Sequence, residues 1–223
     1  MKYEINEIPA VQEASEILPQ TELIETGVLL ERSMLEAVGE VVENTESVIG
    51  NPEKNMESWH IQKGDYSCAV CCQEFVAEQL LGDDFSEDKM VRYASERGWF
   101  DPETGTTLSD VGNLLEAMGL EVNKAQGWSL SELAEELNRG HGVIAGVNNM
   151  VLEDARFAEL PGYRANHAVQ VIGLDYTNPN DVQVILNDSG VQNGQGRRVR
   201  AEVFQKAWAT SGNFAVTAQK GAA

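Results

Sequence analysis

The sequence holds few of the residues from which disulfide-stabilised proteins are built. Only three cysteines occur in 223 residues, and all of them lie between positions 68 and 72. Cysteines this close together cannot form a disulfide framework for a chain of this size. A reducing compartment is therefore the simpler expectation.

Basic residues are scarce as well. The chain has 16 lysines and arginines against 36 acidic residues, which gives a formal net charge of −20. This balance argues against binding to nucleic acid or to anionic membranes, because both need clustered positive charge. No apolar run is long enough to span a membrane, and the N-terminus lacks the basic start and apolar core of a secretory signal. We therefore expect a cytoplasmic protein without a membrane span.

Much of the negative charge lies in an N-terminal segment, residues 1–57, which contains 13 acidic and 3 basic residues. Within it, residues 27–47 place Leu30, Met34 and Val38 on one face of a predicted amphipathic helix. An exposed stripe of this kind would be an apolar patch in water. We expect it to dock on the protein's own surface, on a second copy or on a protein partner.

The remainder of the chain, residues 58–223, is expected to form one α+β domain, with the turn-rich sequence GNPEKN at 50–55 marking the boundary. Helical periodicity dominates its first half and strand-like apolar runs dominate its second half, which favours two lobes. Helices are expected at 68–82, 86–98, 108–119, 129–140 and 201–211, and strands at 142–148, 167–176, 181–188 and 213–218.

Cys68 is the strongest candidate for a reactive group. It follows the polar loop KGDYS and begins a predicted helix. The helix dipole and the unpaired N–H groups at that position favour the thiolate, which is the form that attacks a carbonyl carbon. Cys71 and Cys72 lie one turn further along among apolar residues and are interpreted as small core residues.

Two other uses of the cysteines are less well supported. Cys68 and Cys71 have the CxxC spacing of a redox pair, but the polar residues before them do not form the strand that such a motif usually follows. A metal site needs about four ligands, and neither His60 nor His141 shows ligand spacing.

A nucleophilic cysteine needs a base, a group that orients the base and an oxyanion donor. His167 begins a predicted strand, and Asp188 ends the next one, where a carboxylate can hold the imidazole. Asn187 is the alternative to Asp188 in this role. Gln62 lies six positions before Cys68, and its amide can donate to an oxyanion together with the backbone N–H of Cys68.

In the order Gln, Cys, His, Asp, these residues resemble the papain-like cysteine peptidases. The aspartate and the Cys-to-His separation are more similar to the bacteriocin-leader (double-glycine) peptidase branch, in its free-standing bacterial form. The resemblance covers residues 59–218 and is carried by the stretches WHIQKGDYSCAV, GTTLSDVGNLLEAMGLEV, ANHAVQVIGLDY and VILNDSGVQNGQG.

The resemblance implies a two-lobed fold, in which a helical lobe carries the cysteine helix and an antiparallel β lobe carries the histidine and the aspartate. It implies Cys68 as nucleophile, His167 as base and acid, Asp188 as orienting group and Gln62 as oxyanion donor. A peptide or protein substrate and no cofactor or metal are expected. The same residues are compatible with deamidation, transglutamination or peptide ligation, and a partner-binding module on this scaffold is the alternative from another class.

Overall fold

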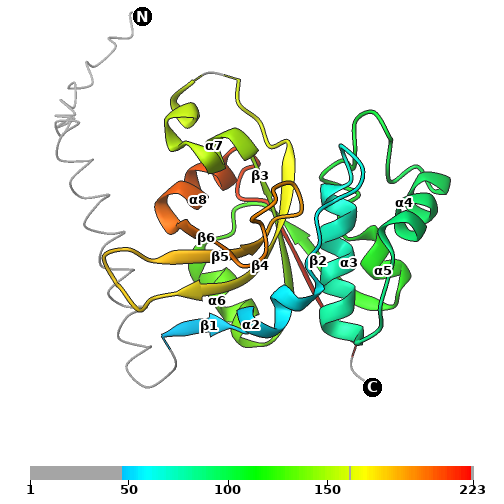
Figure 1. The fold of residues 1–223 in the computed structure, drawn as a ribbon, viewed down its shortest axis with the longest axis horizontal. Coiled ribbons are helices and arrows are strands. Elements are labelled where there is room, and N and C mark those ends of the chain that lie inside the picture. The colour runs from blue at the N-terminus through cyan, green and yellow to red at the C-terminus, as the bar shows by residue number, and fades with distance from the viewer. Residues whose placement is uncertain (1–46, 161, 222–223) are drawn as a thin grey trace, which may run out of the picture. The chain divides into compact units, whose positions relative to one another are not determined.

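The computed structural model describes residues 47–160 and 162–221 (Figure 1). The chain divides into two units, Met1–Asn44 and Thr45–Ala223, and the second contains the described residues. The helix expected at 27–47 lies, apart from Ser47, outside the described part of the chain. The sequence boundary was placed between residues 57 and 58, whereas the second unit begins at Thr45, because residues upstream of 58 contribute a strand to the sheet.

The described residues form an α+β fold (Figure 1). The strands are β1 (Val48–Gly50), β2 (Leu120–Ala125), β3 (Gly142–Val147), β4 (His167–Asp175), β5 (Gln183–Asn187), β6 (Arg197–Arg200) and β7 (Ala215–Lys220). The helices are α2 (Pro52–Asn55), α3 (Cys68–Leu81), α4 (Glu87–Glu96), α5 (Asn113–Ala117), α6 (Leu130–Asn138), α7 (Asn149–Glu153) and α8 (Ala201–Ala209), with 3₁₀ turns η1 (Met56–Ser58) and η2 (Ala155–Glu159). None of these helices is long and apolar enough to cross a lipid bilayer.

The strands pair in one antiparallel sheet of order β2-β7-β3-β4-β5-β6. β4 is its central element. β3 pairs along the first half of β4, with Val147 opposite His167, and β1 pairs along the last residues, with Ile49 opposite Leu174. β5 pairs along the other edge of β4, and the register there shifts between Val171 and Gly173.

Helices cover both faces of the sheet (Figure 1), which explains why β3 is buried along its whole length. Val143 and Ala145 point to the core that contains residues of α6 and α8, whereas Ile144 points to the core that contains residues of α3. This alternation is the period of two expected for a strand. The helices α3, α4 and α5 form one group, and most of the sheet lies beside this group (Figure 1). This arrangement agrees with the two lobes predicted from the sequence.

Most of the predicted elements are present, and the capping box of α6 between Ser129 and Glu132 is formed. The helix predicted at 108–119 is shorter, since only α5 at its end is α-helical. Gly112 adopts φ +99° immediately before α5, a conformation that does not continue a helix. The sequence patterns did not predict the short helices α2 and α7 or the strands β1, β2 and β6; β1 has only three residues, and β2 and β6 carry charged residues that obscure the alternation of a strand.

The sheet holds α3 by close packing at Gly142. A Cβ atom at Gly142 would lie 2.3 Å from Cγ1 of Val76, far inside van der Waals contact. We expect Gly142→Ala to lower the free energy of unfolding by about 1–3 kcal/mol, the usual cost of overpacking a core. Chemical denaturation of the wild type and the variant measures this change.

The matched control is Val76→Ala, alone and combined with Gly142→Ala. Shortening Val76 removes the obstructing methyl groups, so the double variant should lose less stability than the sum of the two single losses. Strictly additive losses would contradict the direct contact.

Candidate active site

The N-terminus of α3 places Cys68 at the surface of the sheet. Ser67, the residue before the helix, does not cap it. Its hydroxyl instead donates to the carboxylate of Glu87 at 2.6 Å and to the carbonyl of Gly64 at 3.0 Å. These bonds fix the loop that leads into the helix. Among the described residues, no acceptor is found for the backbone N–H of Cys68, which therefore remains open to a ligand.

β4 and β5 bring His167 and Asp188 together. Nε2 of His167 lies 2.7 Å from Oδ1 of Asp188. The aspartate is 1% exposed, and its carboxylate is held from two further sides. The backbone N–H of Gly190 donates to Oδ1 at 3.0 Å, and Nη1 of Arg197 donates to Oδ2 at 2.9 Å. The Nε1–H of Trp59 donates to the Asp188 carbonyl at 2.8 Å, so the backbone at this residue is fixed as well.

Asn187, the alternative orienting residue, faces elsewhere. Its side-chain amide donates to the carbonyl of Asn55 and to Oε1 of Gln170, both at 2.8 Å. The structure thus places Asp188 and not Asn187 against the histidine. Asn187 instead joins α2 to the centre of the sheet.

Cys68 and His167 each shift the pKa of the other in the direction that favours its charged form. Burial alone would raise the pKa of Cys68, but the hydrogen bond and the positive charge of His167 outweigh burial and lower it. Burial alone would lower the pKa of His167, but its contacts with Asp188 and Cys68 raise that pKa to about 10. Burial opposes ionisation of Asp188 too, yet His167 and Arg197 keep its pKa below the usual value. The arrangement favours a thiolate–imidazolium pair held by a carboxylate.

Gln62 lies in the same cavity as Cys68, but its amide is already engaged. Nε2 donates to the carbonyl of Gly64 at 2.7 Å and to that of Asp65 at 3.2 Å, and Oε1 accepts from the hydroxyl of Ser189 at 3.0 Å. An oxyanion role requires the longer of the two donated bonds to give way. The placement agrees with the sequence prediction, whereas the free donor that the prediction assumed is not present in this state.

Sequence reasoning missed two residues that support the histidine. Arg197 lies within a charged strand, where its sequence context gave no sign of a buried carboxylate partner. Gly190 packs against the imidazole ring, and a Cβ atom there would lie 2.9 Å from Cε1 of His167. In the sequence, the only signal for this close approach is the stretch Asn-Asp-Ser-Gly, which is also typical of a turn.

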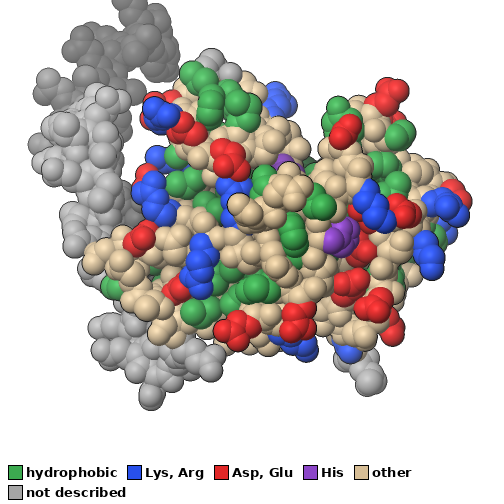
Figure 2. Space-filling model, viewed as in Figure 1, with side chains coloured by type: hydrophobic (Ala, Val, Ile, Leu, Met, Phe, Trp, Pro, Cys, Tyr) green, Lys and Arg blue, Asp and Glu red, His purple; other side chains and the backbone are tan. Residues whose placement is uncertain are grey.

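A cavity of about 630 Å³ contains the candidate residues. It lies between the loop before α5 and the region of α7, where the surface is hollowed (Figure 2). Its walls combine apolar and polar groups. They include Gln62, Cys68, His167 and Asp188, together with Tyr66, Leu108, Val111, Met150 and Glu153. A cavity of this size accepts a ligand as large as a short peptide.

Comparison with known proteins gives relatives of similar length and solved structures of similar fold. A scan against models of protein families gives no match. Proteins of Mycobacterium tuberculosis and Mycobacterium bovis, each described as uncharacterized, are 28% identical over 198 residues, which cover 75% of this chain and 83% of each relative.

The solved structures are peptidases. The peptidase domain of Streptococcus ComA, a bifunctional ABC transporter, aligns with a TM-score of 0.53 at 18% identity, covering 73% of this chain and 98% of that domain. A C39-like peptidase from Bacillus anthracis aligns with a TM-score of 0.55 at 17% identity, covering 75% and 97%. The proform of the ragweed cysteine protease Amb a 11 aligns with a TM-score of 0.51 at 13% identity, covering 80% and 67%. The chain therefore has the papain-like fold of the C39-like peptidases, as the sequence resemblance predicted.

The three thiols should differ sharply in reactivity. Burial raises the pKa of Cys71 and Cys72, whereas His167 lowers that of Cys68. At about pH 6, iodoacetamide should therefore modify Cys68 well before the other two. Peptide mapping by mass spectrometry after short labelling times measures the order.

The His167→Ala variant provides the control. Without the imidazolium, the pKa of Cys68 should rise, and the labelling rate should increase only at a more alkaline pH than in the wild type. Earlier modification of Cys71, or an unchanged pH profile in the variant, would show that Cys68 and His167 do not form the pair described.

Proposed function

We propose that this protein is a cysteine peptidase that cleaves a peptide or isopeptide bond through Cys68, His167 and Asp188. The observation that carries the proposal is the convergence of a thiol of lowered pKa, an imidazole of raised pKa and a buried carboxylate at the wall of one cavity. The papain-like fold supports the same assignment, because it presents these groups from a helix start and two strands.

The first half of the proposed reaction forms a thioester. The Cys68 thiolate attacks the carbonyl carbon of the substrate, and the electron pair of the C=O bond moves to the oxygen. As the C–N bond breaks, the imidazolium of His167 transfers its proton to the departing amine. Asp188 holds Nε2–H, so the other ring nitrogen, Nδ1, faces the sulfur and carries the transferred proton.

The second half releases the acid. The now neutral His167 accepts a proton from water as the water oxygen attacks the thioester carbon, and the C–S bond breaks to restore the Cys68 thiolate. An amine in place of water would give transglutamination or ligation by the same steps. Mass spectrometry of the products with and without an added primary amine distinguishes hydrolysis from transfer.

The oxyanion formed in both halves needs donors. The backbone N–H of Cys68 is open among the described residues, and Gln62 lies beside it in the same cavity. We propose that the developing negative charge draws an amide proton of Gln62 away from the carbonyl of Asp65, where its bond is longest at 3.2 Å.

The substrate is proposed to be a peptide or protein segment with basic residues. Asp65 lines the cavity, where the carboxylate of Glu153 is paired with Arg197 at 2.8 Å, and the whole chain carries a net charge of −20. Such a field attracts cations over several ångströms and speeds their association, an effect that weakens with salt. Screening fluorogenic peptides of different charge, at low and high ionic strength, supplies the assay substrate for the variants below.

Substitutions in the triad should separate catalysis from stability. Cys68→Ala and His167→Ala should each abolish turnover without unfolding the chain. Asp188→Asn should retain part of the activity, because an amide oxygen can still orient the imidazole. Peptide turnover and thermal unfolding of each variant test these expectations.

The informative control is Asn187→Ala. Asn187 is 0% exposed and makes two hydrogen bonds away from the histidine. Its loss should cost about 1–3 kcal/mol of stability, as for other unpaired buried groups, while the folded fraction keeps its turnover. A larger loss of turnover in folded Asn187→Ala than in Asp188→Ala would overturn the choice of Asp188.

Replacing Gln62 should impair the chemical step. We expect Gln62→Ala to lower kcat by roughly 10²–10³, the usual effect of removing one oxyanion donor. Ser189→Ala is the matched control, since it removes the hydrogen bond to Oε1 of Gln62 but leaves the amide donor in place. If both variants reduce kcat equally, Gln62 acts only by holding the loop.

A further inference from the structure

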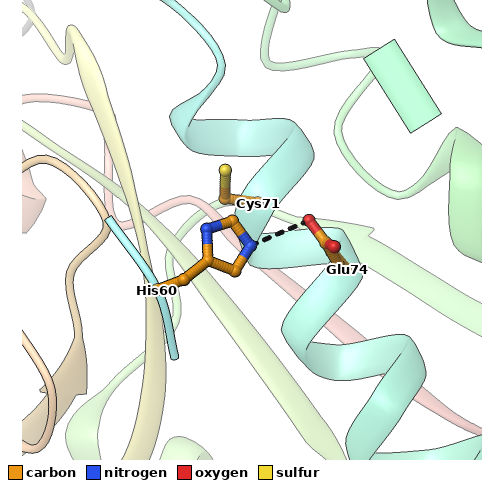
Figure 3. Close-up of side chains that lie close together, drawn as sticks. All are labelled: His60, Cys71 and Glu74. Atoms are coloured by element: carbon orange, nitrogen blue, oxygen red, sulfur yellow. Dashed lines mark hydrogen bonds and ion pairs between the residues drawn. The ribbon is translucent and has the colours of Figure 1, made fainter. Parts of the chain in front are cut away.

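A second group of reactive side chains lies between α3, beyond Cys68, and the segment that precedes this helix, and it has no part in the reaction proposed above. It comprises His60, Cys71 and Glu74 (Figure 3). One ligand atom from each residue lies within 4.8 Å of the others. Cys71 is 0% exposed and the Glu74 side chain 3%, whereas that of His60 is 35% exposed. The group is therefore buried on one side and open to solvent on the other.

The imidazole of His60 is oriented for ligation. Its Nδ1 lies 3.0 Å from the backbone carbonyl of Ile61, which can only accept, so Nδ1 carries a proton. Nε2 points at Oε2 of Glu74, 3.2 Å away (Figure 3). Phe75 packs edge-on against the ring at 5.2 Å between centroids. A histidine that binds a metal through one nitrogen commonly donates its other N–H to a carbonyl in this way.

The distances between these ligand atoms suit a small metal ion that prefers four ligands in a tetrahedral arrangement. With zinc–ligand distances of about 2.0–2.2 Å, neighbouring nitrogen and oxygen ligands lie about 3.3–3.5 Å apart. The observed separation of 3.2 Å between Nε2 of His60 and Oε2 of Glu74 is close to this value. The sulfur of Cys71 lies within 4.8 Å of a ring nitrogen of His60 and of a carboxylate oxygen of Glu74.

Two buried carboxylates lie beside the imidazole of His60. The carboxylate of Glu87 is also 3% exposed and lies 3.9 Å from Nδ1 of His60, so two buried carboxylates share one imidazole. The nearby Lys63 donates its backbone N–H to Glu87, but its ammonium group pairs with Asp88 at 2.8 Å. A divalent cation between Cys71 and Glu74 would balance this charge.

We propose that Nε2 of His60, the thiolate of Cys71 and the carboxylate of Glu74 bind a divalent metal ion of the zinc class, with water from the open side as the fourth ligand. Binding releases the Cys71 proton to solvent as the metal–sulfur bond forms. Imidazole, thiolate and carboxylate together select zinc over magnesium or calcium, which prefer oxygen ligands alone. The ion would join the segment that carries Gln62 to α3.

Cobalt binding provides the direct test. The full chain with Cys68→Ala is used, so that the catalytic thiol and His167 cannot form a competing site. After treatment with a chelator and removal of the chelator, an equimolar amount of Co²⁺ should produce a thiolate-to-cobalt charge-transfer band and strong visible bands of a four-coordinate ion. Added Zn²⁺ should abolish both and raise the melting temperature by several degrees.

Variants in the same background identify the ligands. Cys71→Ser should remove the charge-transfer band, and the neighbouring Cys72→Ser should keep it. Glu74→Gln keeps the shape of the side chain and should weaken Co²⁺ binding at least tenfold. A spectrum without the charge-transfer band in the parent protein would mean that His60 and Glu74 form a metal-free ion pair. A band that survives Cys71→Ser, or full affinity in Glu74→Gln, would equally overturn the proposal.

Discussion

The contact between His167 and the buried carboxylate of Asp188 organises the candidate site and much of the sheet edge around it. A carboxylate that is 1% exposed is stable as an anion only if its oxygens are well hydrogen-bonded. The donors come from different parts of the chain: His167 starts β4, Gly190 follows β5, and Arg197 starts β6. The indole N–H of Trp59, from the segment before α3, donates to the backbone carbonyl of Asp188. The hydrogen bonds that stabilise Asp188 and the shape of the cavity therefore both depend on correct pairing of β4, β5 and β6.

The helix that carries Cys68 has three distinct surroundings, and each decides the state of one thiol. Cys68 faces the imidazole of His167, which favours the thiolate. Cys72 belongs to the apolar core against the sheet, which favours the thiol. Cys71 turns to His60 and Glu74 beside the loop (Figure 3). Three cysteines in five residues can thus have unrelated roles, because Cys72 lies one turn deeper than Cys68 on the same face of the helix, whereas Cys71 is rotated by about 100° from Cys72.

The sequence was sufficient for the fold class and pointed to residues that the structure brings to one cavity, but it did not reveal their further partners. Helix periodicity, the glycines that end helices and the strand texture near His167 and Asp188 are local signals, and they survive in a single sequence. The interaction of Arg197 with Asp188 depends on how β5 pairs with β6, which no local pattern encodes. The meeting of His60 with Cys71 is likewise a tertiary event, and the absence of ligand spacing in the sequence was a poor guide to it.

β1 and the histidine of the candidate site lie at opposite ends of the same strand, β4. Val48 pairs with Asp175, the last residue of β4, whereas His167 is the first residue of the same nine-residue strand. At about 3.4 Å per residue, the strand separates these two points by roughly 27 Å. The nine residues of β4 therefore set the distance between the first strand of the described chain and the histidine of the candidate site.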